Sequence, residues 1–381
     1  MITVGEFIKR FEAYCPKSLA YGKDPIGLHF GNSNQPVKKI MVTLDIRPEV
    51  VEEAIYKKVD LIMAHHPPIF RPITSFDTGV PQQKMYADLI KHDIAVYAAH
   101  TNLDIVSDGL NDWLAEALWL QQTQVLSPTG KLSYKKIVVF VPITHTKQVQ
   151  QDMFHAGAGQ MGTNYHECSF KVKGVGEFTP IETANPVIGS VGTHEEVEEE
   201  RLEMICREDL LSSVLAALRQ AHPYEVPAYD VFTVENITET VGFGRVGELD
   251  SAMTLQAFLQ QVQQAFQVQG LRYVVPKSMT LDTLVKRIAV CGGAGDDFYR
   301  DALAAGADVY VTGDVYFHTA HDIQAAGLTV IDPGHHIEKI CVPKLIDKIT
   351  TWAEELSWDV EVIASEIDTE PFCFFVAGEQ Q

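Results

Sequence analysis

Two stretches of this chain share one pattern of apolar and polar positions. Residues 39–65 and 287–313 each read as an apolar strand, a turn, a helix and a second apolar strand, so that Lys39 aligns with Arg287 and Asp60 with Asp308 without a gap. The strands are continuous apolar runs such as IMVTL and VYVT. Such runs are typical of parallel strands that helices cover on both faces. The pattern therefore predicts two related α/β halves.

Each half continues in the same way. A helix is expected at residues 82–92 and at 318–326, and a third strand follows each of them (IAVYAA and LTVI). Both third strands end in polar residues, at 100–104 and 332–338. All β-α-β units resemble one another to some degree, but the equal spacing and the matching polar ends favour a repeat. The chain begins with an expected amphipathic helix, which places Val4, Phe7, Ile8 and Phe11 on one face.

The halves, residues 1–130 and 240–381, are separated by residues 131–239. This stretch predicts the strand YKKIVVFVP, a helix from Thr146 to about Ala156, further strands, a helix at Asp209–Ala221 and the strand AYDVFTV. That order is typical of a ferredoxin-like module. The expected fold class is therefore α/β, with two pseudo-repeated three-layer halves that form one metal-binding domain and an inserted ferredoxin-like α+β domain.

Composition narrows the function classes. The 381 residues carry a formal net charge of -21, which opposes binding to nucleic acid or to anionic membranes. The densest acidic run, residues 195–200, is interpreted as solvated surface. Six cysteines without a C-x-x-C pair fit reduced thiols. Neither a signal peptide nor an apolar run of ~18 residues is present, so we expect a cytoplasmic protein outside the membrane.

Three polar clusters follow predicted strands and carry ligand-type side chains. His65 and His66 follow the strand LIMA and precede two prolines, so an extended chain is expected to point them to opposite sides, each towards a different ion. Asp104 is assigned as a carboxylate that bridges two cations, because Ser107 suits the cap of the next helix better. His100 is either a hydrogen-bond donor or a ligand. Open α/β sheets place their sites at the carboxyl ends of strands.

The third cluster reads Gly334-His335-His336-Ile337-Glu338. His335 and Glu338 share one face of a helical first turn, although a glutamate there also suits the helix dipole. Pro343 indicates that this turn is short and that a longer helix follows. Imidazole with carboxylate suits two divalent ions of Zn, Fe, Mn, Co or Ni, and the ligand types do not choose among these metals.

Together these motifs resemble one known family, the GTP cyclohydrolase I type 2 homologues, also called the Nif-three-like dinuclear metal-centre family. The matching segments cover both halves in the expected order: Gly27-Leu28 with Gly31, residues 64–67, 100–104, 242–247, Gly313-Asp314 and 332–338. The insert resembles the optional PII-like domain of longer members at Gly157-Ala158-Gly159, Gly162, Asn164-Tyr165, Cys168 and residues 221–225.

The resemblance implies metal ligands at five positions: His65, His66, Asp104, His335 and Glu338. It also implies a ring-shaped homohexamer whose sites face an internal cavity that holds a small-molecule ligand or substrate. Some members space the last histidine and glutamate four apart, so His336 stays open as an alternative to His335.

Other motifs have weaker interpretations. Residues 242–247 match G-x-G-x-x-G, but no acidic residue ends the next strand, so a structural turn beside the metal site is favoured over a nucleotide site. The loop at 291–296 is interpreted as a tight turn rather than a phosphate cradle. His222-Pro223-Tyr224-Glu225 fits a packing contact better than a ligand sensor. His318 and His321 either line the cavity or are solvated.

Three function hypotheses remain. The first is a metal-dependent hydrolase that acts on a cyclic amidine or phosphate-bearing substrate, with His100 as acid or base. The second is a metal-handling or PII-like ligand-sensing regulatory protein without turnover. In the third, the metals only stabilise a scaffold.

Overall fold

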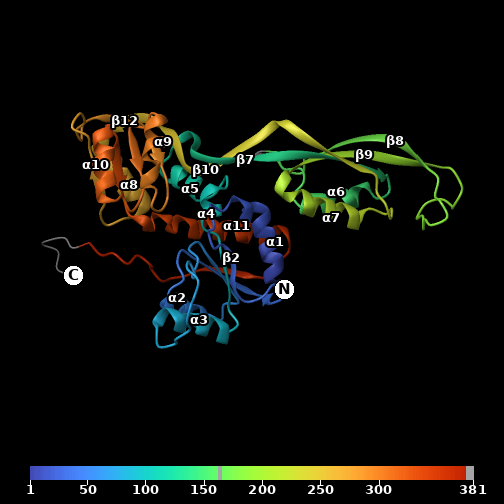
Figure 1. Ribbon diagram of the computed structural model, residues 1–381, viewed down its shortest axis with the longest axis horizontal. Helices are drawn as coiled ribbons and strands as arrows, with labels where there is room; N and C mark the ends of the chain where they lie inside the picture. Colours follow the sequence, from blue (N-terminus) through green and yellow to red (C-terminus); the bar gives the residue numbers. More distant parts are fainter. Residues whose placement is uncertain (162–164, 375–381) are drawn as a thin grey trace. The chain divides into compact units, whose positions relative to one another are not determined.

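The computed structural model of the protein describes residues 1–161 and 165–374 (Figure 1). Residue contacts divide the chain into two compact units, Met1–Thr129 with Val241–Gln381 and Gly130–Thr240. Strands β7 (Gln121–Pro142) and β10 (Tyr229–Thr254) each pass from one unit into the other. Within the described ranges, no helix combines the length and apolarity that crossing a membrane demands.

The first half of the first unit is built on a five-stranded sheet in the order β15-β4-β5-β6-β2. Parallel pairing joins β15 (Glu361–Ala364), β4 (Lys39–Thr43), β5 (Leu61–Ala64) and β6 (Ala95–Ala98), while β2 (Gly27–Phe30) is antiparallel. All residues of β5 and β6 are buried, which explains their continuous apolar sequence.

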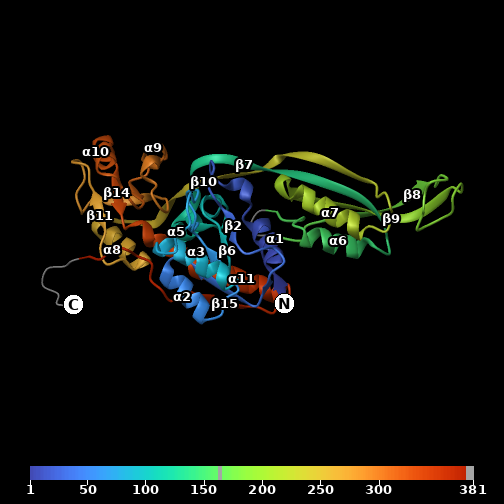
Figure 2. The same ribbon diagram turned by 60° about the horizontal axis from the view of Figure 1, so that its bottom comes forward.

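Helices cover both faces of this sheet (Figure 2). One face packs on α2 (Pro48–Tyr56) and α3 (Pro81–Lys91) through a core that includes Met41, Ile62 and Val96. On the other face lie α1 (Val4–Tyr14) and α11 (Cys341–Glu355), where Phe11 contacts Tyr97 and Trp352 with ring centroids 5.4 and 6.2 Å apart. The expected layered α/β half is therefore present.

The second half repeats the parallel core. Strands β12 (Leu284–Val290), β13 (Val309–Val311) and β14 (Thr329–Asp332) are parallel, while β10 and β11 (Arg272–Val274) flank them antiparallel. The helices of this half are α8 (Leu255–Phe266), α9 (Tyr299–Ala304) and α10 (Phe317–Ala326).

The repeat predicted from the sequence extends to individual hydrogen bonds. Oδ2 of Asp60 accepts from the backbone N–H groups of Lys38 and Lys39 at 2.8 and 2.9 Å. Its counterpart Asp308 accepts in the same way from Lys286 and Arg287, both at 2.8 Å. One aspartate thus fixes the start of the first strand in each half, which confirms that the two stretches are equivalent.

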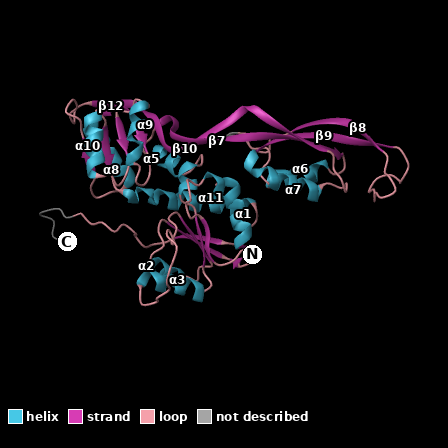
Figure 3. Ribbon diagram, in the orientation of Figure 1, coloured by secondary structure: helices cyan, strands magenta, loops and turns pink. Residues whose placement is uncertain are grey.

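The second unit has the predicted order of strand, helix, two strands, helix and strand. Helices α6 (Thr146–His155) and α7 (Leu211–Ala221) lie on one side of the strands (Figure 3). Strand β9 (Glu195–Arg207) pairs antiparallel with both β7 and β8 (Phe170–Phe178). Gly162 and Asn164, which take part in the PII-like resemblance, lie outside the described residues.

Three local predictions were wrong. The acidic run 195–200 is not merely solvated surface, because it begins β9 and Glu199 is buried and accepts a hydrogen bond from Tyr224. The G-x-G-x-x-G match lies inside β10 rather than in a turn. The N-cap of α5 (Leu110–Ala117) is Gly109 and not Ser107. Ser107 lies in the short link between the end of α4 (Thr101–Ile105) and Gly109.

Candidate metal centre

The centre lies within the first unit, where the carboxyl ends of the parallel strands of both halves meet. Ala64 and Ala98 are register partners at the ends of β5 and β6, so His65 and His100 follow neighbouring strands. In the other half, Asp314 follows β13 and His335 follows β14. Parallel strands bring their polar ends to one edge, and the repeat supplies two such edges.

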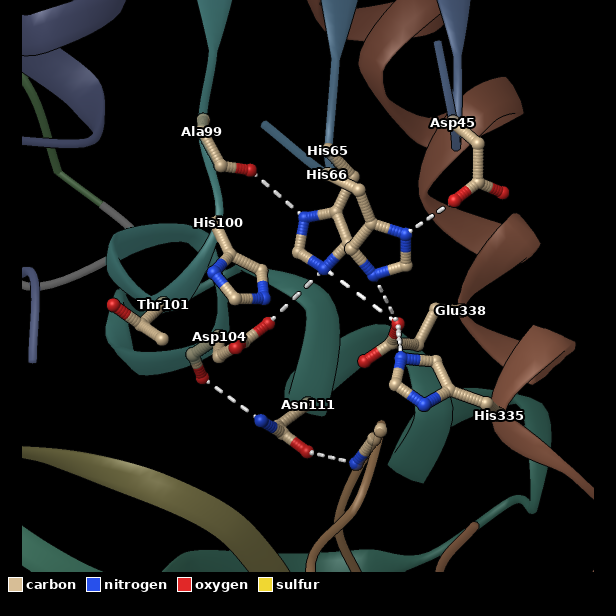
Figure 4. Close-up of polar contacts among 12 residues, drawn as sticks. Asp45, His65, His66, Ala99, His100, Thr101, Asp104, Asn111, His335 and Glu338 are labelled. Carbon is tan, nitrogen blue, oxygen red and sulfur yellow. Dashed lines mark hydrogen bonds and ion pairs between the residues drawn. The ribbon is translucent and has the colours of Figure 1, made fainter. Parts of the chain in front are cut away.

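His65 and His66 lie side by side rather than on opposite sides of an extended chain. Their ring centroids are 4.9 Å apart and both rings point into the centre (Figure 4). The chain bends here, because the N–H groups of the two residues bond to the carbonyls of Thr43 and Leu44 at 3.2 and 2.9 Å. The expectation of opposed side chains is therefore wrong.

A hydrogen bond at Nδ1 orients each of the four imidazoles, and Figure 4 draws those of His65 and His66. The partner is the Ala99 carbonyl for His65 at 2.8 Å and a carboxylate for the others: Asp45 for His66 at 2.7 Å, Asp24 for His100 at 2.9 Å, and Asp314 for His335 at 2.7 Å. This arrangement fixes the ring and leaves Nε2 as the atom that could coordinate a metal ion, as in metal-ligating histidines generally.

Glu338 is the carboxylate at which these rings converge. It belongs to η4 (His335–Ile340) and is 3 % exposed. Its Oε2 lies 2.9 Å from Nε2 of His66, 3.1 Å from Nε2 of His335 and 3.8 Å from Nε2 of His65. The short turn followed by α11 confirms the prediction from Pro343.

Asp104 approaches the centre from α4. Its Oδ1 lies 3.5 Å from Nε2 of His65, and its backbone carbonyl accepts a hydrogen bond from Asn111 at 2.9 Å. Asn111 in turn accepts from the N–H of Gly292 at 3.0 Å. The buried Asn111 therefore ties α4 to the loop after β12, and this loop lies against Glu338.

The loop at 291–296 contacts the centre through its glycines. A Cβ on Gly293 would lie 2.8 Å from Oε1 of Glu338, and Gly293 has a φ of +61°. Both the space and the backbone conformation therefore require glycine here. This loop accommodates a ligand-type carboxylate, which agrees with the prediction of a tight turn.

The described residues form three groups whose ligand-type atoms all lie within 4.8 Å of one another. They are His65 with Asp104 and Glu338, His66 with His335 and Glu338, and His65 with His66 and His100. Glu338, rather than Asp104, is the carboxylate that two groups share. Asp104, which we expected to bridge two cations, belongs to only one of these groups.

His336 does not face the centre. Its Nε2 lies 3.4 Å from Oγ1 of Thr369 and 3.5 Å from Oδ1 of Asp368, and its Nδ1 lies 3.9 Å from Glu370. Of the two neighbouring histidines, His335 is the one directed at Glu338. His318 and His321 on α10 are exposed and contact the ring of Phe317.

The electrostatics of the centre favour bound positive charge. Burial opposes protonation of His66, but its hydrogen bonds to Asp45 and Glu338 outweigh burial and raise its pKa to about 10. The hydrogen bond to Glu338 raises the pKa of His335 to about 9. Burial, opposed by His65 and reinforced by Glu338, raises the pKa of Asp104 to about 6. Although burial acts to raise it, the imidazoles hold the pKa of Glu338 well below its usual range.

Two buried polar atoms test whether a cation fits. Nε2 of His65 and Oδ1 of Asp104 are both buried, and neither has a hydrogen-bond partner within the described ranges. Buried polar atoms without partners are costly and uncommon in folded proteins. A cation held between a neutral imidazole nitrogen and a carboxylate would satisfy both atoms, so these residues fit a metal ion.

Sequence reasoning missed the outer partners of the imidazoles. Asp45 carried a usable signal, because it follows the buried strand β4 at the edge that His65 and His66 occupy. Asp314 was noted as part of a motif but given no role. Asp24 lies in a loop far from His100 in sequence, and nothing in the local pattern indicates their contact.

The fold and the centre together define a mixed α/β protein whose histidines and carboxylates are grouped so that they could hold metal ions. A family model described as Duf34/NIF3 (NGG1p interacting factor 3) matches residues 2–371. The chain belongs to the Duf34/NIF3 family, and this confirms the resemblance drawn from its motifs.

Individual relatives span nearly the whole chain. A Bacillus subtilis protein named GTP cyclohydrolase 1 type 2 homolog is 45% identical over 369 residues, which are 97% of this chain and 98% of the relative. The crystal structure of a Bacillus cereus protein related to NIF3 has a TM-score of 0.81 at 43% identity and covers 98% of this chain and 99% of that one. The Staphylococcus aureus protein SA1388 has a TM-score of 0.69 at 28% identity with the same coverage.

Proposed function

We propose that this protein binds two divalent cations and hydrolyses a small molecule at them. One observation carries the proposal: two groups of ligand-type side chains, one buried and one partly exposed, share the single carboxylate of Glu338. We assign His65 and Asp104 to one cation, His66 and His335 to the other, and Glu338 to both. The donor set suits Zn, Fe, Mn, Co or Ni.

Bound cations would supply Lewis-acid polarisation of a substrate oxygen and a lowered pKa of water at neutral pH. The protein's own residues would orient the substrate and exclude water from the buried side of the centre. His65 is fully buried and accessible to solvent through none of its atoms, whereas the side chain of His335 is 38% exposed. A substrate therefore reaches the centre from the side of His335 and His66.

We assign proton transfer to His100. Its ring lies 5.4 Å from that of His65 and 5.5 Å from that of His66, and Asp24 engages its Nδ1 through both carboxylate oxygens. Burial acts to lower the pKa of His100, but the hydrogen bonds to Asp24 and the negative charges of Asp24 and Asp104 outweigh it and raise that pKa. A protonated imidazole held beside the centre is suited to donate a proton to a leaving nitrogen or oxygen.

The substrate class rests on the relatives. Their name, GTP cyclohydrolase 1 type 2 homolog, supports hydrolytic opening of a cyclic amidine such as the imidazole ring of a guanine nucleotide. The test is GTP turnover by protein loaded separately with Zn²⁺, Mn²⁺ or Co²⁺. We expect turnover in the wild type, a loss of at least ~100-fold for H100Q, and no turnover for H65A.

H318A is the matched control, because His318 is an exposed histidine on α10 of the same unit. It is expected to retain wild-type turnover. Equal rates for H65A and the wild type would overturn a role for the metal centre in this reaction. A panel of cyclic amidines and phosphate esters without any turnover would contradict the hydrolase.

The uneven exposure of the two groups supports a second candidate, a metal-handling protein without turnover. The cation at His66 and His335 would exchange readily, whereas the one at His65 and Asp104 would be retained. Rapid loss of one equivalent of Co²⁺ to a chelator, together with no turnover, would favour this candidate. Slow loss of both Co²⁺ equivalents to the chelator, together with turnover of a substrate, would favour the hydrolase.

We further propose that residues 131–239 form a PII-like regulatory domain. We also propose that six copies of the chain form a ring around an internal cavity that admits small molecules. The proposed location of the protein is the cytoplasm. The residues that match the family motifs support the first two assignments, and the free cysteines fit the third. Light scattering on the purified full chain tests the assembly, and a monomer at all concentrations would contradict the ring.

A further inference from the structure

The segment after β15 returns to the metal centre. Ser365 continues the sheet by donating its N–H to the carbonyl of Val42 at 3.0 Å. Its hydroxyl donates to Glu53 at 2.5 Å, and Lys57 pairs with Glu366 at 2.8 Å. We call residues 365–370 the C-terminal segment. These contacts fasten its first two residues to α2, well before the segment reaches the centre.

Thr369 contacts the outer partner of a ligand-type histidine. Its hydroxyl donates to Oδ2 of Asp45 at 2.6 Å, while Oδ1 of the same carboxylate holds Nδ1 of His66 at 2.7 Å. Both oxygens of Asp45 are therefore engaged, one by the C-terminal segment and one by the imidazole. Thr369 and Asp45 are 324 residues apart in the chain, so only the fold creates this contact.

We propose that Thr369 is a positioning residue of the metal centre, which acts through Asp45 to hold the His66 imidazole in its coordinating orientation. The inference rests on the proposed function, because it concerns cation binding at His66. A carboxylate held at one oxygen only can rotate about its terminal torsion, which is broad and weakly restricted. The threonine hydroxyl removes that freedom, so that Nε2 of His66 stays directed at Glu338.

The surroundings of Thr369 support a built position rather than a chance contact. Oγ1 of Thr369 also lies 3.4 Å from Nε2 of His336, whose ring is flanked by Asp368 and Glu370. A cavity of about 430 Å³ lies beside this segment and is lined by His336, Ile337 and residues 365–369. His336 thus connects the C-terminal segment with the turn that carries His335 and Glu338.

Three variants distinguish positioning of the His66 imidazole by Thr369 from anchoring of the C-terminal segment alone. T369V removes the hydroxyl and keeps the branched shape, while T369S keeps the hydroxyl. S365A removes a hydroxyl from the same segment, but that hydroxyl contacts Glu53 and not Asp45. Binding of Co²⁺ alone is measured by calorimetry and by the visible spectrum, and the melting temperature of each metal-free variant is recorded beside it.

We expect T369V to weaken one of the two Co²⁺ binding events by ~10-fold, at the lower end of the range for outer partners of metal ligands. T369S and S365A should bind as the wild type does, even where S365A lowers the melting temperature. Wild-type affinity for both ions in T369V would overturn the inference. Equal weakening by S365A would overturn it as well, because the effect would then belong to loosening of the segment.

The coupling between metal binding and the C-terminal segment can also be measured from the segment's side, without determining a Co²⁺ affinity. If metal binding and the C-terminal segment are coupled, each must stabilise the other. Hydrogen exchange of the amides at Glu366 and Glu370 should therefore slow when Co²⁺ is added to the wild type, and should slow less in T369V. Unchanged exchange in the wild type would contradict the coupling. If the wild type takes up no Co²⁺, the proposed function itself is overturned. If the wild type takes up Co²⁺ normally and T369V binds it with the same affinity, only this inference is overturned.

Discussion

The Nε2 atom of His66 lies 2.9 Å from Oε2 of Glu338, although 272 residues separate the two in the chain. His66 follows β5, the second parallel strand of the first half, and Glu338 follows β14, the third parallel strand of the second half. The contact therefore joins the carboxyl edges of two related sheets, and under the proposed function the shared carboxylate would make the two halves depend on one another for cation binding.

This relationship predicts unequal effects for the two buried carboxylates. E338Q should abolish binding of both proposed cations, because Glu338 belongs to two of the three ligand groups, the two assigned to those cations. D104N should abolish only the cation held by His65. Elemental analysis after dialysis against a trace of Zn²⁺ measures the stoichiometry. Two equivalents retained by E338Q would contradict the shared role.

The neighbouring histidines of η4 should differ. H335A removes an imidazole whose Nε2 is 3.1 Å from Glu338, so we expect the loss of one bound equivalent. H336A should retain both equivalents at saturating metal, because the ring of His336 faces Asp368 and Thr369. The same elemental analysis decides the matter, and the reverse pattern of losses would show that the ligand is His336.

Arg245 is expected to matter for stability and not for nucleotide binding. Its side chain is 4% exposed, and its guanidinium pairs with Asp112 and donates to the carbonyls of Gly242, Gly244 and Val106. R245K cannot fill this planar arrangement and should lower the free energy of unfolding by about 3 kcal/mol.

Urea denaturation of R245K and of R287K gives the comparison. Arg287 is partly exposed, pairs with Glu248 at 3.5 Å and donates from Nε to the carbonyl of Ala305 at 2.7 Å, so its replacement should cost about 1 kcal/mol, less than that of Arg245. Similar costs for the two variants would show that the G-x-G-x-x-G segment is not held by its arginine.

The second unit should lose stability in acid through His222. Burial lowers the pKa of His222, whose Nε2–H donates to the carbonyl of Phe140 at 2.9 Å while Nδ1 accepts from the N–H of Tyr224. Protonation thus favours the unfolded chain, where the pKa is about 6.5. This contribution is present above that pH and is lost as the pH falls through the lowered pKa of the folded state.

The measurement is hydrogen exchange of the Tyr224 amide between pH 7.5 and 5, corrected for the intrinsic pH dependence of exchange. Protection should fall with pH in the wild type and fall less in H222Q, which keeps a donor for Phe140. Identical profiles in the two proteins would exclude His222 as the titrating group.

Much of the architecture could be predicted because it depends on local pattern. The hydrophobic period and the length of each segment predict the continuous apolar strands and the order of elements in the insert. The same pattern gives Asp60 and Asp308 equal spacing in the two halves. One local error shows the limit of composition. The acidic run was judged by composition, yet β9 alternates its side chains, and Glu199 lies on the face that packs beneath Tyr224.

The sequence by itself determined the repeat, the family and the identities of the ligand-type side chains, because strand ends in an α/β repeat must meet at one edge. Only the tertiary structure decided which carboxylate is shared, which of His335 and His336 faces the centre, and that Asp24, Asp45 and Asp314 orient the imidazoles. These choices depend on how side chains from distant segments pack within a few ångströms, and no local pattern encodes such contacts.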